Sequence, residues 1–254
     1  MPLTVENLRF AYVPEHPVLQ NISLTVEDGE FVSVVGPNGS GKTTLVKCLN
    51  RIHTPEGGSI SFDELDVLRA RPREVAEKIG YVPQSEACCL SGTVTDYILL
   101  GRRRFLKWRV SRRDLDAVME AMARLDITEL GSRELSELSG GQKQKVLIAR
   151  ALVQEPDVFL FDEPTSNLDI KNQLEIMQLA REIARDLHKT VIMVVHDLNM
   201  AAHFSDRVAL MDGGQIVAFG PPQEILTPER IRSVYGVRVA VTADCLIDPF
   251  AFLF

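Results

Sequence analysis

One nine-residue segment, GPNGSGKTT at residues 36–44, constrains the fold of this chain more strongly than any other feature. It overlaps the end of the apolar run FVSVVG (31–36), precedes residues with helical periodicity, and fits the pattern GxxxxGK[ST] of a phosphate-binding loop. In such a loop the backbone N–H groups surround the phosphates of a nucleotide, Lys42 contacts the β and γ phosphates, and the Thr43 hydroxyl ligates Mg²⁺. A simple glycine turn would account for the glycines, but not for the lysine and threonine. The predicted nucleotide-binding residues are Gly36, Pro37, Asn38, Gly39, Ser40, Gly41, Lys42, Thr43 and Thr44.

Short apolar segments that favour β structure alternate with helical segments, which predicts an α/β fold with a mainly parallel sheet and helices on its faces. Between Gln84 and Pro156 the strand signals stop, and residues 93–153 have largely helical periodicity. We therefore expect a helical subdomain inserted into an α/β core. The predicted strands are 31–36, 79–83, 158–161 and 191–195, followed by a closing hairpin of 208–211 and 215–220 around Asp212, Gly213 and Gly214.

The 254 residues have an ordinary globular composition, with 45% hydrophobic and 25% charged residues. The net charge of −7 and the pI near 5.3 argue against a protein that binds nucleic acid through a general basic surface. Binding through a local basic patch is still compatible with this charge. The N-terminus lacks the apolar core of a signal peptide, and no apolar run approaches the roughly 18 residues that span a bilayer. The four cysteines, which show no CxxC spacing, are Cys48, Cys88, Cys89 and Cys245. These features predict a reduced, cytosolic chain that meets a membrane only through a partner.

Two carboxylates, Asp162 and Glu163, follow the apolar segment 158–161, where its strand would end beside the phosphate loop. Asp162 would hold Mg²⁺ directly or through its water shell, and Glu163 could act as general base toward the attacking water. An acidic pair at a strand end is usually only solvated, but a buried strand in a chain with a phosphate loop favours the functional interpretation. His196 follows the segment 191–195 in the same way. It could contact the γ-phosphate, or serve equally well as a structural histidine.

A second segment, ELSGGQKQKVLIARAL at residues 137–152, also has the features of an anion site. Ser139 can cap the helix that follows, and Gly140 and Gly141 have no Cβ to block close approach. The free N–H groups and the dipole at a helix start attract phosphate. In isolation, a serine and two glycines would more simply be a helix cap. Two phosphate-binding elements in one short chain therefore need a common explanation.

The motifs together resemble those of the ATP-binding cassette (ABC) ATPases, and the match covers nearly all of the chain. A phosphate loop, a glutamine that ends a strand, LSGGQ, an apolar strand with Asp-Glu, SNLD and a histidine after a further strand occur in the order of that family. The resemblance implies ATP and Mg²⁺ as cofactors and ATP hydrolysis as the activity. It also implies that Tyr12 stacks on adenine, although an aromatic residue in an N-terminal strand is commonly part of the core. By the same resemblance, the catalytic residues are Lys42, Gln84, Glu163 and His196, the metal ligands are Thr43, Gln84 and Asp162, and Asp169 lies at a dimer interface.

The resemblance further implies a P-loop NTPase core with an N-terminal antiparallel β element and an inserted helical subdomain. Two copies would pack head to tail, so that the signature segment of each caps the nucleotide on the phosphate loop of the other. This homodimer would explain two phosphate-binding elements in one chain. The signature residues are Leu138, Ser139, Gly140, Gly141 and Gln142. We expect the ATP-binding core at 1–87 and 157–222, the helical subdomain at 88–156, and a C-terminal helical extension with an apolar tail at 223–254.

Within that family, the segments at 93–103 and 196–237 look most like the ATPase subunits of importers for siderophore iron, haem and cobalamin, and related cassettes serve molybdate or tungstate. The implied partners are two membrane permease subunits, one helix of which would dock near residues 84–104, and an external substrate-binding protein. This would place the chain at the cytoplasmic face of the cell membrane. Two features depart from the pattern: RRFLKW (103–108) replaces the usual proline-histidine, and the apolar tail ends in FAFLF. A soluble ABC ATPase of assembly, repair or translation and a regulator that does not hydrolyse ATP stay open as alternatives.

A basic run extends from Arg102 to Arg113, with seven basic residues and no acidic one. The favoured interpretation is a solvated face, because the run is not obviously one amphipathic surface. Contact with anionic lipid headgroups or with an acidic permease loop is the alternative. Cys88 and Cys89 lie near the expected docking region and are interpreted as small apolar packing residues.

Overall fold

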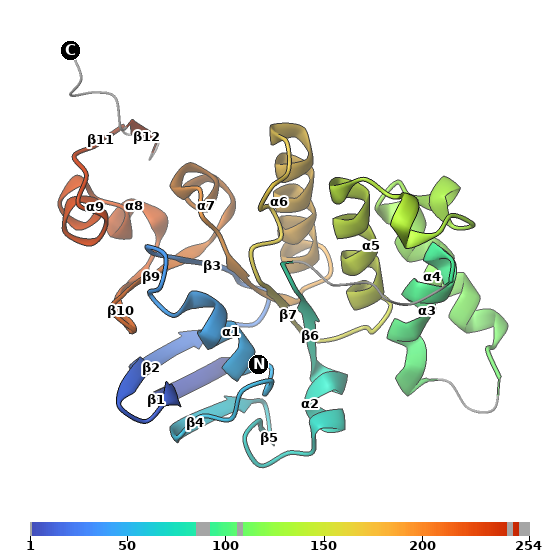
Figure 1. Cartoon of the computed structure of the whole chain (residues 1–254), viewed down its shortest axis with the longest axis horizontal. Coiled ribbons are helices and arrows are strands. Elements are labelled where there is room, and N and C mark those ends of the chain that lie inside the picture. The colour runs from blue at the N-terminus through green and yellow to red at the C-terminus, as the bar shows by residue number, and fades with distance from the viewer. Residues whose placement is uncertain (1, 85–91, 106–108, 243–245, 249–254) are drawn as a thin grey trace.

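The computed structural model describes residues 2–84, 92–105, 109–242 and 246–248. The central sheet consists of β3 (Phe31–Val35), β6 (Ile79–Val82), β7 (Val158–Phe161), β8 (Thr190–Val194), β9 (Arg207–Asp212) and β10 (Gln215–Gly220). Its strand order is β10-β9-β3-β8-β7-β6, and all neighbours are parallel except β10 and β9 (Figure 1). Every residue of β3, β7 and β8 is buried, which explains their largely apolar sequences. The predicted strands and the closing hairpin are confirmed, and their ends differ from the prediction by one residue at most.

The hydrophobic core has two parts, one on each face of the central sheet. On one face, Phe159 and Phe161 pack among helices that include α6 (Ile170–Arg185) and α7 (Leu198–Phe204). On the other face, Leu160 packs with α1 (Lys42–Leu49) and the N-terminal strands. Successive strand residues point to opposite faces, so one apolar strand serves both parts of the core. This packing fixes the strand ends against which the functional loops lie.

A second, antiparallel sheet covers the α1 face of the core. Its strand order is β2-β1-β4-β5 (Figure 1). The strands are β1 (Leu3–Val13), β2 (His16–Val26), β4 (Gly57–Phe62) and β5 (Leu65–Asp66), and α2 (Pro72–Lys78) then leads into β6. The predicted N-terminal antiparallel β element is therefore confirmed.

The stretch predicted to be helical lies beside the sheet as a separate group of helices (Figure 1). It contains α3 (Val94–Leu99), η1 (Leu100–Arg104), α4 (Arg112–Arg124), η2 (Thr128–Leu130), η3 (Leu135–Glu137) and α5 (Gly140–Leu152). The three α-helices begin after Thr93, Ser111 and Ser139, and each of these side chains accepts the backbone N–H of the third helical residue. The domain boundaries expected from the sequence stay a prediction.

The chain continues past the hairpin into a small C-terminal unit. This unit contains α8 (Pro222–Ile225), α9 (Pro228–Tyr235), β11 (Ala240–Val241) and β12 (Ile247–Asp248). The Asn199 side chain on α7 binds the backbone of Ile247 twice, donating to its carbonyl at 3.2 Å and accepting from its N–H at 2.7 Å. The C-terminal hairpin is thereby held against α7. The predicted apolar tail and the pair Cys88 and Cys89 lie outside the described residues.

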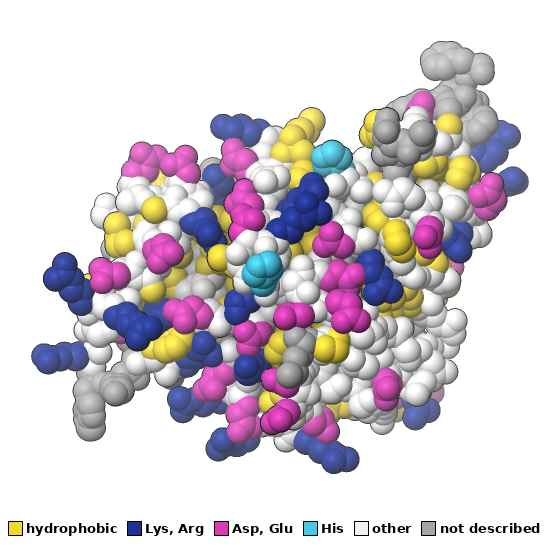
Figure 2. Space-filling model, turned by 180° about the vertical axis from the view of Figure 1, so that it is seen from behind, with side chains coloured by type: hydrophobic (Ala, Val, Ile, Leu, Met, Phe, Trp, Pro, Cys, Tyr) yellow, Lys and Arg dark blue, Asp and Glu magenta, His cyan; other side chains and the backbone are white. Residues whose placement is uncertain are grey.

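The surface carries charges of both signs. Figure 2 shows basic and acidic side chains interspersed over the face opposite to that of Figure 1. None of the helices within the described ranges has the length and apolar character needed to cross a membrane.

The basic run was interpreted as a solvated face. This interpretation is wrong for Arg102. This side chain is 2% exposed and donates to Asp114 Oδ1 at 3.2 Å and to Glu155 Oε1 at 2.5 Å. A further bond goes to the Val153 carbonyl at 3.1 Å. Its guanidinium also lies 3.7 Å from the centroid of the Phe105 ring. Arg102 therefore joins η1, the start of α4 and the end of α5, whereas Arg103, Arg109, Arg112 and Arg113 are exposed.

We predict that Arg102→Met lowers the free energy of unfolding by about 3 kcal/mol, because it leaves the buried Asp114 carboxylate without its cation. The measurement is denaturant unfolding followed by circular dichroism. Arg103→Met, an exposed neighbour, is the matched control and should change the value by less than about 0.5 kcal/mol. Equal effects of the two substitutions would contradict a structural role for Arg102.

Candidate nucleotide-binding site

The phosphate loop connects the end of β3 to α1. Gly36 begins it with φ of 153°, and a Cβ at this position would lie 2.2 Å from the Met211 carbonyl oxygen on β9. Gly41 ends it with φ of 99°, directly before the first helical residue. A side chain would clash at the first position and strain the backbone at the second. The glycines therefore allow the strand to turn abruptly into the helix.

Lys42 is the first residue of α1, and its side chain folds back over the loop. Its ammonium donates to the Gly36 carbonyl at 2.9 Å and to the Pro37 carbonyl at 3.0 Å. Burial lowers the pKa of Lys42, and the nearby carboxylates Glu163 and Asp162 oppose this shift. The Lys42 ammonium thus lies inside the loop, whose backbone would surround the phosphates of a nucleotide.

The Asp162 carboxylate directly follows β7 and is 3% exposed. Its Oδ1 accepts a hydrogen bond from Thr43 Oγ1 at 2.7 Å, and its Oδ2 accepts one from Tyr81 Oη at 3.1 Å. Burial, and then the nearby Asp162 carboxylate, raise the pKa of Tyr81, so this hydroxyl keeps its proton and donates it. Sequence reasoning missed Tyr81, because an aromatic residue in a strand indicates packing and not a polar contact.

The Glu163 carboxylate is the meeting point of two further predicted residues. Its Oε2 accepts a hydrogen bond from Gln84 Nε2 at 3.0 Å and lies 2.8 Å from His196 Nε2. Gln84 also donates to Ser166 Oγ at 3.2 Å. Glu163 has φ of 51°, an unusual backbone conformation for a residue with a side chain. The ends of β6, β7 and β8 therefore bring together three residues that are far apart in the sequence.

Tyr12 lies near the end of β1 and is 58% exposed, so it is not a core residue. Its hydroxyl is 3.2 Å from Thr44 Oγ1 in the phosphate loop and 3.1 Å from His53 Nε2. The His53 ring in turn stacks on Phe10, with centroids 5.1 Å apart. An exposed aromatic ring beside the phosphate loop suits the stacking on adenine that we expect, and His53 is a neighbour that sequence reasoning missed.

The oxygen atoms at this site suit Mg²⁺. Thr43 and Asp162 present a hydroxyl and a carboxylate, which are ligands that this cation prefers. Within the described ranges, no group of three or more His, Cys, Asp or Glu side chains could hold a metal by itself.

The signature segment lies at the start of α5. Ser139 accepts the Gln142 backbone N–H at 3.3 Å, as a helix cap does, and Leu138 before it is buried. Gly140 is exposed, and a Cβ there would meet only Leu168 at 3.8 Å. Gly141 is buried, and a Cβ there would lie 2.8 Å from Asn172 Oδ1 on α6. Only Gly140 thus leaves its surface open to a phosphate, and Gly141 serves the packing of two helices.

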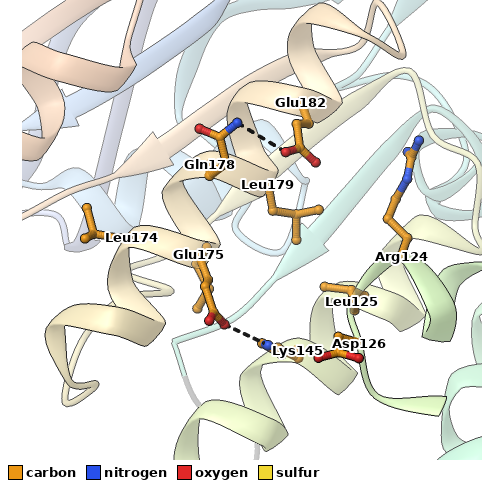
Figure 3. A pocket seen from close by; sticks show the side chains of 10 residues that line it. Arg124, Leu125, Asp126, Lys145, Leu174, Glu175, Gln178, Leu179 and Glu182 are labelled. Carbon is orange, nitrogen blue, oxygen red and sulfur yellow. Dashed lines mark hydrogen bonds and ion pairs between the residues drawn. The ribbon is translucent and has the colours of Figure 1, made fainter.

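One ion pair ties the signature helix to α6, and Asp169 caps α6 beside it. Lys145 on α5 and Glu175 on α6 form an ion pair at 2.8 Å, which Figure 3 shows at the edge of a surface pocket. The hydrogen bond and the charge of Lys145 lower the pKa of Glu175. Asp169 caps α6 by accepting the Asn172 backbone N–H at 2.8 Å, and it also holds the Asn172 amide. Asp169 therefore has a local structural task, and its predicted place at a dimer interface stays a prediction.

The two phosphate-binding elements do not meet within one chain. Among the residues that the structure describes, no hydrogen bond or ion pair joins residues 36–44 to residues 138–142. The phosphate loop contacts the ends of β7 and β1, whereas the signature segment contacts α6. That each element is half of a site shared by two copies stays a prediction.

The fold and this arrangement define a P-loop nucleotide hydrolase. Residues 19–166 match the family model described as ABC transporter. Over 243 residues the chain is 36% identical to the ferric enterobactin transport ATP-binding protein of Escherichia coli, which covers 94% of this chain and 89% of that protein. This chain therefore belongs to the ABC transporter ATPase family.

Solved structures agree with this assignment. An inward-facing metal-chelate type ABC transporter superposes with a TM-score of 0.82 and 31% identity, covering 95% of this chain and 93% of the matched chain. A dimeric ATP-binding cassette in a post-hydrolysis state, bound to ADP and Pi, superposes with a TM-score of 0.78 and 28% identity, covering 87% and 98%. The fold expected from the motifs is confirmed, and the chain is an ATP-hydrolysing cassette.

We predict that Glu163→Gln keeps ATP binding but lowers turnover by roughly 10² or more, because the amide keeps the size of the carboxylate and cannot accept a proton from water. Phosphate release and binding of a fluorescent ATP analogue are measured on the same protein. Turnover close to that of the wild type would exclude Glu163 as the base.

Lys42→Ala should act differently, because it removes the cation that faces the phosphates and leaves the Gly36 carbonyl without the Lys42 ammonium as its donor. We expect nucleotide binding itself to be lost in the same fluorescence titration. Intact binding with slow turnover would contradict the assigned position of the Lys42 ammonium.

Proposed function

We propose that this chain is the ATP-hydrolysing subunit of an ABC importer for a metal chelate or a related cofactor. The observation that carries the proposal is Glu163, held between Gln84 and His196 and next in sequence to Asp162. The substrate class is an iron-siderophore, haem or cobalamin, with molybdate or tungstate as further candidates. Support comes from the relative named for ferric enterobactin transport and from the metal-chelate type transporter.

The proposed partners are two membrane permease subunits and an external substrate-binding protein, and they do not include nucleic acid. Binding to the permease would place the chain at the cytoplasmic face of the membrane.

The residues at the site support hydrolysis by general-base chemistry. Both interactions with the Glu163 carboxylate use Oε2, so among the described residues Oε1 has no partner and could take the proton of a water molecule. Bound Mg²⁺ would neutralise the charge that develops on the phosphates. Lys42 would exchange the loop carbonyls for phosphate oxygens, and His196 would turn toward the γ-phosphate. The attacking water would form the new P–O bond as the bond to ADP breaks, and its proton would pass to Glu163.

A head-to-tail homodimer would supply the missing half of each site. The exposed surface at Gly140 is the part of the signature segment that could approach a phosphate on a second copy. In a twofold dimer each contact occurs twice, so two nucleotides would be enclosed. ATP would favour the closed dimer because its γ-phosphate bridges the two chains, and hydrolysis would remove that bridge.

We predict that a crosslink between the phosphate loop and the signature segment forms between chains and depends on ATP. Asn38 and Gly140 are exposed and serve as sites for introduced cysteines, whereas Ser40 and Leu138 are buried. The native cysteines are removed, and Asn38→Cys with Gly140→Cys is treated with a short thiol crosslinker in a Glu163→Gln background. A dimer band that requires ATP and Mg²⁺ is expected on a denaturing gel.

The single substitutions Asn38→Cys and Gly140→Cys are the matched controls and should give no more than collisional dimer. A product of monomer mobility, or a dimer that forms equally without ATP, would contradict the head-to-tail arrangement.

A groove between α2 and η1 is our proposed docking surface for the permease helix. Its lining residues are Arg73, Ala76, Glu77, Leu100, Gly101, Arg103, Arg104 and Gln154. Leu100 is 47% exposed and offers the apolar contact that a docking helix needs. Its neighbour Leu99 packs against the hydrophobic core and does not offer this contact.

We predict that Leu100→Glu lowers transport by roughly tenfold or more in the reconstituted transporter, because a charge replaces an apolar contact in the lining of the groove. The basal ATPase of the isolated subunit should be unchanged. Leu115→Glu on α4 is the matched control, since Leu115 is 44% exposed and lies outside the groove.

Equal loss of transport and of basal ATPase would make Leu100 an ordinary structural residue. Normal transport would remove the groove as the docking surface. A chain that assembles with no permease would favour the alternative, a soluble ABC ATPase of assembly or repair.

A further inference from the structure

The two oxygens of the buried Asp162 carboxylate have different donors from different elements. Thr43, in the first turn of α1, binds Oδ1 at 2.7 Å. Tyr81, on β6, binds Oδ2 at 3.1 Å. The first donor belongs to the nucleotide loop, and the second belongs to the central sheet.

The strand donor is the more rigid of the two. β6 and β7 pair in parallel, with Tyr81 opposite Leu160, and the Asp162 N–H donates to the Val82 carbonyl at 2.9 Å. The Tyr81 ring packs against the core on the α1 side of the sheet. The position of the Tyr81 hydroxyl relative to the Asp162 backbone is therefore set by the pairing of β6 with β7.

Carboxylate orientation matters for metal binding. The terminal torsion of an aspartate side chain has a broad distribution, so a carboxylate with one donor can rotate. Substituting a residue that holds a metal ligand in place commonly lowers metal affinity by roughly 10- to 100-fold. A second donor, bonded to the carboxylate oxygen that Thr43 does not contact, would restrict this rotation.

We propose that Tyr81 is a positioning residue, whose hydroxyl fixes the Asp162 carboxylate so that Oδ1 faces Thr43 and the metal position. Tyr81 thereby strengthens the coupling between Mg²⁺ and nucleotide binding. This inference rests on the proposed Mg²⁺-ATP chemistry of the site, and it assigns a role to the hydroxyl that is separate from the packing of the ring.

The test is Tyr81→Phe, which removes the hydroxyl and keeps the ring. ATP affinity is measured by calorimetry in a Glu163→Gln background, once with Mg²⁺ and once with EDTA, and the ratio of the two affinities is compared. We expect Tyr81→Phe to lower this ratio roughly tenfold while the affinity in EDTA stays the same. A binding ratio is used because it does not depend on turnover.

The matched control is Tyr97→Phe. Tyr97 is 3% exposed and its hydroxyl accepts a hydrogen bond from Arg150 at 2.6 Å, so this change removes a comparable hydroxyl that does not bind Asp162. Its ratio should equal that of the parent. Thermal unfolding of both variants confirms that they are folded.

Three results would overturn the proposal. An unchanged ratio in Tyr81→Phe would show that Thr43 alone orients Asp162. A loss of affinity that is equal in Mg²⁺ and in EDTA would show that Tyr81 acts by packing. A parent protein whose ATP affinity does not respond to Mg²⁺ would overturn the proposed metal chemistry and the role of Tyr81 with it.

Discussion

The hydrogen bond between Thr43 and the Asp162 carboxylate connects the phosphate loop to the central sheet. Asp162 is buried where β7 ends, and a buried carboxylate is stable only when its oxygens have partners. Thr43 and Tyr81 supply these partners from α1 and β6. The site therefore depends on the order of strands in the sheet, because that order places β6, β7 and the start of α1 at one edge.

The arrangement around Glu163 depends on the same edge. Parallel strands end on one side of a sheet, and ligands of open α/β sheets bind outside those ends. Glu163 follows β7, Gln84 follows β6 and His196 follows β8, so three neighbouring strands deliver one base and its two contacts. The left-handed backbone of Glu163 lets consecutive carboxylates serve different partners. This separation fits one role in metal binding and another in proton transfer.

The signature segment shows how a motif can have structural and functional tasks together. Ser139 caps α5 and Gly141 makes room for Asn172, so both residues are explained within one chain. Of the two glycines, only Gly140 is open, and it supports the proposal that a second copy is needed. The ion pair of Lys145 and Glu175 holds this helix against α6.

The sequence by itself determined the strands of the central sheet, the phosphate loop and the family, because glycine spacing and apolar runs act locally and recur in a known order. The roles that it assigns to the site residues stay predictions. It could not determine contacts that depend on which distant side chains become neighbours. Arg102 was expected on a solvated face, yet it is buried against Asp114 and Glu155. Tyr81 had the pattern of a packing residue, and only the pairing of β6 with β7 brings its hydroxyl to Asp162. Tertiary structure decided these partners because burial removes water and leaves each polar group dependent on whatever donor or acceptor the fold places beside it.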